Sequence, residues 1–421
     1  MPKGKHARHR HRPCRRVLAS ATTLSLPLLG LFAFASDAGA SVIYPTCPES
    51  GVTRTGEQSE GVEQDNAGQT WDLTGAVFSD PDLFPYPIRS ESWQDGCIVG
   101  GSVLGPIDPA ATRDQWYNSG THGGADHEGV RITHGSAGFA VVRDTYVEDV
   151  EDGFDPNAPT PDAKTYLDHV HASNVRDDCI ENEKEPHDMY VRDSLFDGCF
   201  AAFAEKPSGS SVDAGRGESE FVVEESLVYV KPQPLGDGYC SDSNVDRGRC
   251  IDDGNGGYLG AYGMFKWGED AASTLVVRNT IFRMDLASYS SCSGNRFPTN
   301  GVYENVTLVW TGEGDWESAG GCDNVVPHGV TVTTDVSVWD RAKAAWLAGG
   351  GTPDPTPETT PETTPEPTPE TTPEPTPEPT EEPTAEPSAS PEPDSKPGKG
   401  PKCRPVVRSP MVRDKVTCTY R

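Results

Sequence analysis

The sequence predicts an all-β chain that folds as a right-handed parallel β-helix, a solenoid of stacked coils. A short phrase recurs along it, as Val-Arg-Asp-Thr-Tyr-Val at 142–147, Val-Arg-Asp-Ser-Leu-Phe at 191–196, Val-Glu-Glu-Ser-Leu-Val at 223–228 and Val-Arg-Asn-Thr-Ile-Phe at 277–282. Residues 167–172 and 303–308 fit the same frame, so the third positions are 144, 169, 193, 225, 279 and 305. A period in the twenties indicates a solenoid, because one coil cannot bury its own apolar face. The longest gap, 54 residues, predicts two coils of 27.

Short apolar alternations broken by Gly, Asp and Asn predict strands from Trp71 onward, notably in 74–78, 97–104 and 129–133. Roughly eight or nine coils fit the span. Residues 156–164 and 232–258 interrupt the period as loops. Residues 335–348 predict a short helix, stopped by three glycines, that caps the open end of the solenoid.

Changes in composition divide the chain into five segments. Residues 1–40 are a signal peptide, with seven basic residues, a short apolar run and a small-residue cleavage site. Residues 41–70 are a polar lead-in and residues 71–350 the β-helix. Residues 351–395 form a disordered Pro/Thr/Glu-rich linker, and residues 396–421 a basic tail with two cysteines. We therefore expect a secreted, extracellular protein without a transmembrane anchor, and the tail is a candidate attachment to an anionic cell wall.

Ten cysteines remain after the predicted signal, an even number that predicts disulfides in an exported chain. Nearest neighbours in sequence favour three pairs, Cys240–Cys250, Cys292–Cys322 and Cys403–Cys418. Cys179 and Cys199 are expected either to stack in the core or to bond to each other.

The charge is concentrated in the body of the chain. Residues 1–40 carry +6, 352–395 carry −12 and 396–421 carry +7; since the total is −30, residues 41–351 carry −31. Such a body should repel nucleic acid and anionic membranes, and also acidic polysaccharides unless calcium or a local basic patch intervenes. Solubility alone would also explain the charge. We expect a monomer, because a capped solenoid leaves no sheet edge to pair.

Three successive coils carry acidic turns, at 151–155, 177–181 and 197–200. Equivalent positions of adjacent coils lie about 4.8 Å apart, so Asp152, Asp177 and Asp178 are predicted to meet on one patch. Crowded carboxylates raise one pKa and give a proton donor beside an ionised base, as inverting glycoside hydrolysis requires. The alternative is that these acids only stabilise their own turns through hydrogen bonds to the backbone.

The order Asp-Gly-x-Asp at 152–155, followed one coil later by Asp-Asp-Cys-Ile at 177–180, resembles the polygalacturonases of the pectin-lyase-like β-helix superfamily. The resemblance implies that Asp152, Asp177 and Asp178 are catalytic. The chain departs from that family's pattern in three places. Val150-Glu151 replaces Asn-Thr, Arg176 replaces a glycine, and no histidine follows in 197–199.

Further residues are predicted to line a substrate groove beside this patch: Glu181, Glu205, Lys206, Lys266 and Trp267. A lysine next to an aromatic ring suits sugar binding, although an edge tryptophan and a surface lysine are equally consistent with plain packing. Lys206 and Lys266 are also the candidates for the base of a lyase. No cofactor is required, but the loop residues Asp242, Asn244, Asp246 and Asp253 have partial calcium-loop spacing.

Two functions follow from these observations. The first is a secreted enzyme, a hydrolase or lyase, that acts on or binds an extracellular polysaccharide or cell-wall polymer through Asp152, Asp177 and Asp178. The second is a non-catalytic adhesion or structural module displayed on the linker. Carboxylates gathered on one open face favour the first, and carboxylates that cap their own turns favour the second.

Overall fold

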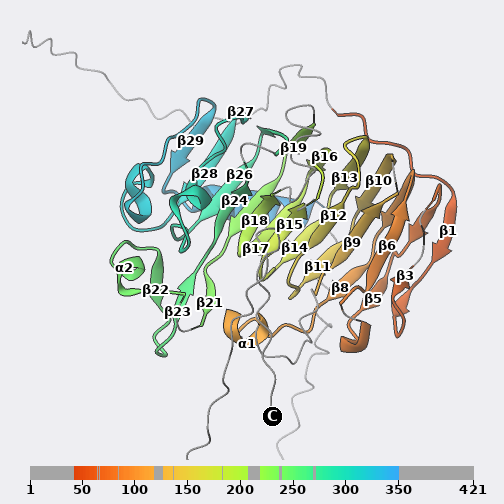
Figure 1. Cartoon of the computed structure of the whole chain (residues 1–421), viewed down its shortest axis with the longest axis horizontal. Helices are drawn as coiled ribbons and strands as arrows, with labels where there is room; N and C mark the ends of the chain where they lie inside the picture. The colour runs from red at the N-terminus through yellow and green to blue at the C-terminus, as the bar shows by residue number, and fades with distance from the viewer. Residues whose placement is uncertain are drawn as a thin grey trace, which may run out of the picture. The chain divides into compact units, whose positions relative to one another are not determined.

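The computed structural model describes residues 42–349 except 64, 66, 84, 118–126, 136, 183, 207–218, 237–238 and 269–271. The predicted signal peptide, linker and basic tail, with Cys403 and Cys418, lie outside the described residues. Within them, the chain winds through three parallel sheets, here called A, B and C, coil upon coil (Figure 1). The predicted parallel β-helix is confirmed.

Each sheet takes one strand from successive coils, in chain order. Sheet A contains β1 (Ser50–Thr53), β4 (Thr70–Asp72), β7 (Gly96–Val99), β10 (Gly138–Arg143), β13 (Ala163–Asp168), β16 (Asp188–Arg192), β19 (Glu220–Glu224), β25 (Thr274–Arg278) and β27 (Val302–Glu304). Sheet B contains β2 (Gly56–Glu57), β5 (Ala76–Phe78), β8 (Ser102–Leu104), β11 (Tyr146–Glu148), β14 (His171–Ser173), β17 (Leu195–Cys199), β20 (Leu227–Val230), β26 (Ile281–Met284), β28 (Val306–Trp310) and β29 (Val330–Thr333). Sheet C contains β3 (Val62–Glu63), β6 (Ile88–Trp93), β9 (Val130–His134), β12 (Phe154–Asn157), β15 (Asp178–Asn182), β18 (Ala201–Glu205) and β24 (Gly263–Trp267).

The solenoid differs from the sequence expectation at two points. Its first strand, β1, starts at Ser50 and pairs with β4, so part of the expected lead-in is already coiled. The 54-residue gap between phrases is one coil, because β19 pairs directly with β25 and β20 with β26. The extra residues form an insertion between β20 and β24, and the prediction of two coils was wrong.

The repeated phrase marks the turn from sheet A to sheet B. Its third residue has a left-handed backbone in every copy, with φ between 45° and 55° at Asp144, His169, Asp193, Glu225, Asn279 and Asn305. The next residue is a fully buried Thr or Ser in four copies, and its hydroxyl donates to the carbonyl two residues back. The phrase therefore has three parts. A residue with a left-handed backbone makes the corner, a Thr or Ser hydroxyl then binds a backbone carbonyl of the turn, and an apolar strand follows.

The interior is a column of apolar side chains in register. Phe154, Ile180, Phe203 and Phe265 pair along sheet C, and all are buried. Cys179 and Cys199 lie fully buried in the same core and form a disulfide. The described residues also contain the predicted pairs Cys240–Cys250 and Cys292–Cys322, together with Cys47–Cys97.

The insertion carries a small antiparallel sheet with its own apolar cluster. Strand β23 (Tyr258–Gly260) lies between β21 (Gln233–Leu235) and β22 (Cys250–Asp252), next to the helical turn α2 (Asp242–Val245). A second, five-residue helix, α1 (Arg113–Tyr117), belongs to the long connection between β8 and β9. Short 3₁₀ turns lie at Pro81–Leu83, Cys292–Asn295 and Trp316–Gly321.

The predicted C-terminal helix is α3 (Ser337–Ala348). Its buried Trp339 and Trp346 pack with Leu195, Leu227 and Val309 of sheet B. The helix thus lies along the outer face of sheet B, over the middle coils, and not over the open end as expected. The reason is an apolar outer row on sheet B, which has to be covered. Among the described residues, no helix has the length and apolar character needed to span a membrane.

Candidate functional site on sheet C

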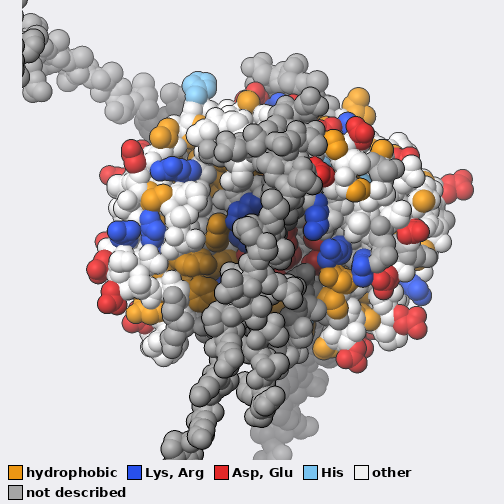
Figure 2. All heavy atoms as spheres, in the orientation of Figure 1, with side chains coloured by type: hydrophobic (Ala, Val, Ile, Leu, Met, Phe, Trp, Pro, Cys, Tyr) orange, Lys and Arg blue, Asp and Glu red, His pale blue; other side chains and the backbone are white. Residues whose placement is uncertain are grey.

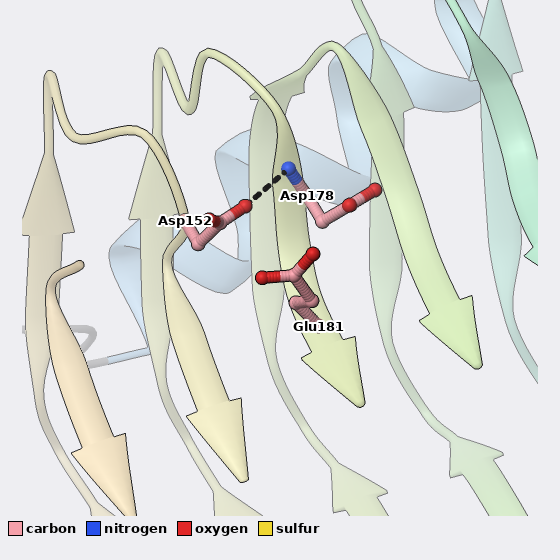
Figure 3. A group of neighbouring side chains, drawn as sticks. All are labelled: Asp152, Asp178 and Glu181. Atoms are coloured by element: carbon pink, nitrogen blue, oxygen red, sulfur yellow. Dashed lines mark hydrogen bonds between the residues drawn. The ribbon is translucent and has the colours of Figure 1, made fainter. Parts of the chain in front are cut away.

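Asp152 and Asp178 occupy equivalent positions of adjacent coils. Each lies two residues before the core residues Phe154 and Ile180, which are paired in register. The Asp152 carboxylate points toward the Asp178 backbone, whose N–H donates to Oδ1 of Asp152 at 2.9 Å, while the Asp178 carboxylate points away from Asp152 (Figure 3). The stacking that was predicted from the period is confirmed, and Asp152 binds the backbone of the neighbouring coil rather than that of its own turn.

Glu181 completes a cluster of three carboxylates. One oxygen each of Asp152, Asp178 and Glu181 lie within 4.8 Å of one another, and Figure 3 shows all three groups on the same side of the strands. Asp178 and Glu181 both come from β15, and Asp152 from the turn before β12. This spacing is tighter than the ~6.5–9.5 Å between the carboxyl groups of inverting glycosidases. The three acids therefore form one close group.

Lys266 reaches this cluster from β24, two strands away. Its Nζ lies 2.6 Å from Oδ2 of Asp178 and also contacts Oδ1 of Asp177. The strand between them, β18, places Ala204 directly beside Lys266 in register. Because alanine is short, the lysine side chain has room to cross β18 and pair with acids on β15.

Arg113 approaches the same acids from helix α1. Its guanidinium donates to Oδ2 of Asp177 at 2.8 Å, so Asp177 lies between two cations. Arg176 holds the start of that connection, through a hydrogen bond to the carbonyl of Pro109 at 3.2 Å and another to that of Ala111. The long connection between β8 and β9 is thus fixed against the acidic patch by charged side chains.

Burial and neighbouring charges shift the pKa values of the acids in opposite directions, so some acids are protonated and another is ionised. Burial raises the pKa of Asp178 to about 7; Asp177 adds to this rise and Lys266 opposes it. Burial, with the charges of Glu181 and the aspartates, raises the pKa of Asp152 well above its ordinary value. Near neutral pH this group of carboxyls therefore retains protons. Oδ1 of Asp178 is buried without a hydrogen-bond partner among the described residues, whereas Oδ2 is bound by Lys266.

Asp177 and Lys266 keep their charges. Burial acts to raise the pKa of Asp177, but Lys266 and Arg113 outweigh it and leave the pKa below its usual value. Burial acts to lower the pKa of Lys266, but Asp178 and Asp177 raise it well above its usual value. A lysine held in this state is an electrostatic partner and not a proton acceptor.

The spacing of Asp152, Asp178 and Glu181 would also suit a hard divalent cation, which prefers carboxylate oxygens. The ammonium of Lys266 already supplies positive charge to Asp178, so the cluster does not require one. The loop expected to bind calcium is arranged differently. Asp242 begins the helical turn α2, while the Asp253 carboxylate accepts from the backbone N–H groups of Asn255 and Gly257 at 2.7 and 2.9 Å. Asp242, Asp246 and Asp253 do not converge among the described carboxylates, whereas the sheet C acids do.

Two residues expected to contact substrate face the interior instead. Glu205 is fully buried, and its carboxylate accepts from the Ser273 N–H at 2.6 Å and from Asn182 at 3.1 Å. Trp267, paired with Glu205 in register, packs on Phe221 and Phe265. Side chains of a strand alternate between faces, so Lys266 and Trp267 cannot both line one surface.

Lys206 lies at the exposed edge of the site, whereas the third acidic turn lies on another sheet. Lys206 is exposed, and its Nζ lies 5.2 Å from the ring of Tyr262. Asp197 lies on sheet B and pairs with Lys343 of α3, away from the acids of sheet C. The position of Asp197 in the third acidic turn suggested that it would extend the patch. The structure shows that it does not.

The sequence did not reveal Arg113, Tyr239, Tyr262 and Tyr289. The three tyrosines surround Phe200, next to Lys266 and Arg113. No local pattern identifies them, because they reach the site from the insertion, the connections around it and the β8–β9 connection.

The chain matches no protein-family model, no curated protein and no solved structure.

Proposed function

We propose that this chain is an exported hydrolase that cleaves glycosidic bonds in an extracellular polysaccharide, on the outer face of sheet C. The observation that carries the proposal is the meeting of Asp152, Asp178 and Glu181 within 4.8 Å, beside the ion-paired Asp177. Acids that retain a proton next to one that stays charged are what hydrolysis of an acetal needs. The resemblance of 152–155 and 177–180 to polygalacturonases supports the same reaction class.

The roles follow from the contacts. Asp178 is the source of the proton that the glycosidic oxygen receives as its bond to the anomeric carbon breaks. One oxygen each of Asp152 and Glu181 lie within 4.8 Å of each other, and one water with hydrogen bonds of about 2.8 Å spans such a gap, so these two acids hold the attacking water. The water oxygen bonds to the anomeric carbon, and Glu181, the most accessible of the three, takes its proton. Lys266 and Arg113 hold Asp177 ionised.

The contacts of Lys266 do not favour a lyase, because its ammonium is bound by two carboxylates and stays protonated. Export is supported by the basic and apolar character of residues 1–40 and by four disulfides among the described residues. The protein acts as a monomer in this proposal.

The test is a screen for new reducing ends and for unsaturated products over plant and microbial polysaccharides. Asp178→Asn should lower kcat by at least a hundredfold, the ordinary effect of losing a general acid. The matched control is Asp197→Asn, which removes an equally ion-paired aspartate from sheet B and should leave kcat unchanged. Activity should fall as the pH rises through about 7, where Asp178 loses its proton. Full activity in Asp178→Asn would falsify the proposed site.

One observation favours a second function, a polysaccharide-binding module without catalysis. The carboxylate of Asp152 is already used by a backbone N–H, and those of Asp177 and Asp178 by Lys266. If the protein binds a polysaccharide in the same screen but releases neither reducing ends nor unsaturated products, this second function replaces the first.

A further inference from the structure

Asp177 has an aromatic residue at the equivalent position of each of the next two strands of sheet C. Ala201 pairs with Asp178 and with Gly263, so the residues before them, Asp177, Phe200 and Tyr262, form one row across three coils. The backbone supports this row, because the Tyr262 N–H donates to the carbonyl of Phe200 at 2.8 Å. Since adjacent strands lie about 4.8 Å apart, Tyr262 lies roughly 10 Å from Asp177 along the solenoid.

Three tyrosines form the surface of this aromatic group. Tyr289 lies at the centre, with ring centroids 5.7 Å from Phe200, 5.9 Å from Tyr239 and 6.3 Å from Tyr262. Phe200 is buried and forms the base, whereas Tyr239, Tyr262 and Tyr289 are half-buried. Figure 2 shows hydrophobic side chains gathered over the region of β21 to β24, next to basic side chains.

Cations connect the aromatic group to the acids. Lys266, which pairs with Asp178, has its Nζ 5.0 Å from the ring of Tyr262. Arg113, which pairs with Asp177, lies 5.1 Å from the ring of Phe200. Lys206 also contacts Tyr262, because its Nζ donates to the phenolic oxygen at 3.4 Å. The tyrosines are therefore continuous with the site and not a separate core of the insertion.

We infer that Tyr239, Tyr262 and Tyr289 form a sugar-binding platform, on which a pyranose ring of the polysaccharide stacks on the β24 side of the scissile bond. The apolar face of a sugar ring packs on an aromatic face, while its hydroxyls need hydrogen-bond partners at the rim. Lys206 and the hydroxyls of Tyr239 and Tyr262 supply those partners. This inference rests on the proposed function, and it replaces Trp267, which faces the core, as the aromatic shelf.

Binding is measured by titration calorimetry in the Asp178→Asn background, so that the ligand is not cleaved. The probes are hexasaccharides of α-1,4-linked galacturonate, β-1,4-linked glucose and β-1,4-linked N-acetylglucosamine. At least one should bind, and Tyr289→Ala and Tyr239→Ala should each weaken it about tenfold. Tyr289→Phe, which keeps the ring, should bind within about twofold of the parent. The matched control is Tyr258→Ala, because Tyr258 belongs to the same apolar cluster but makes no ring contact with Tyr289 among those described.

The outcomes separate the two proposals. Binding that is unchanged in both Tyr289→Ala and Tyr239→Ala overturns the platform and leaves the hydrolase untouched. Binding that depends on these tyrosines, in a protein that cleaves nothing, supports the platform and overturns the hydrolase. If no hexasaccharide binds, or if Tyr258→Ala weakens binding as much as Tyr289→Ala does, the platform is rejected.

Discussion

Asp178 takes part in two kinds of interaction at once. Its backbone N–H is bound by the carboxylate of Asp152, while its own carboxylate is bound by Lys266 and keeps one oxygen free of partners. The two interpretations of these acids, as turn formers or as chemical groups, are therefore not exclusive. Asp152 stabilises the corner of the next coil and, by doing so, fixes the position of the acid that it faces.

Glu205 gives a prediction at this scale, because its proton is coupled to folding. Burial raises its pKa from 4.5 to about 7, although Ser273 and Asn182 donate to it. Between these two pH values the folded state holds a proton that the unfolded state has lost. Stability is therefore complete below pH 4.5 and falls as the pH rises to about 7, by up to about 3 kcal/mol from this group.

Urea unfolding of the native chain and of Glu205→Gln, at pH 4.5 and pH 7.5, measures this contribution. The native chain should lose more stability between the two pH values than the variant, because glutamine does not titrate. Glu317→Gln is the control, as it changes an exposed carboxyl outside the acidic cluster. Equal losses in the native chain and in Glu205→Gln would contradict the assignment.

At this scale the sequence predicted which acids meet but not which neighbours face them. Asp152 and Asp178 were placed together because one period separates them, and a period is visible in a sequence. Lys266 was assigned to the site together with Trp267, yet the two residues point to opposite sides of β24. Their directions depend on the register of β24 with β18, and the insertion before β24 hides that register.

At the scale of elements, the repeated phrase shows which residues form the turn between sheets A and B. A non-glycine residue with a left-handed backbone costs roughly 1–2 kcal/mol, and each copy of the phrase accepts that cost at its third position. The following hydroxyl offsets part of it by satisfying the turn: Ser226 Oγ donates to the carbonyl of Glu224 at 2.8 Å and accepts from the Ser194 N–H at 3.2 Å. Polar residues at the third position, followed by Thr or Ser in four of the six copies, made the period recognisable in advance.

Helix α3 gives the prediction at this scale. Trp339 is 1% exposed and belongs to an apolar cluster separate from the solenoid interior. Trp339→Ala should lower the free energy of unfolding by about 3–5 kcal/mol, through lost burial and the cavity that remains. Leu347→Ala, at a residue 45% exposed, should change it by less than about 0.5 kcal/mol.

Chemical denaturation followed by tryptophan fluorescence measures both variants, and far-ultraviolet circular dichroism should stay β-rich in each. A Trp339→Ala chain as stable as its parent would show that α3 does not contribute to folding. The sequence identified this helix from its spacing of aromatic residues, but not its location. The apolar outer row that it covers is shared by several strands of sheet B, and no single segment displays it.

At the scale of the whole molecule, disulfides tie coils to each other or to their insertions. Cys179–Cys199 joins adjacent coils over a separation of 20 residues, one residue after Asp178. Replacing both cysteines by alanine should lower the free energy of unfolding by about 3 kcal/mol, since the unfolded chain gains the freedom that the bond removes. The control is the double replacement Cys240→Ala with Cys250→Ala, which opens a 10-residue separation in the insertion.

Urea unfolding followed by circular dichroism compares the two double variants. The first should shift the main transition of the solenoid, and the second should shift it less, because its bond lies in a separate apolar cluster. A main transition that moves equally in both would contradict this division.

The fold class and the meeting of Asp152 with Asp178 were predictable from periodicity, because residues one period apart lie on adjacent coils. The coil count and the aromatic platform were not predictable in this way, because they depend on where the insertion begins and ends.

The insertion between β20 and β24 adds some thirty residues to one coil without changing the pairing on either side of it, since β18 still meets β24 and β20 still meets β26. The length of the chain between paired strands can therefore change without altering the geometry of the reacting groups. A descendant protein is free to lengthen, shorten or exchange this segment, and so to acquire a new ligand preference, while inheriting an unaltered arrangement of Asp178 and Lys266.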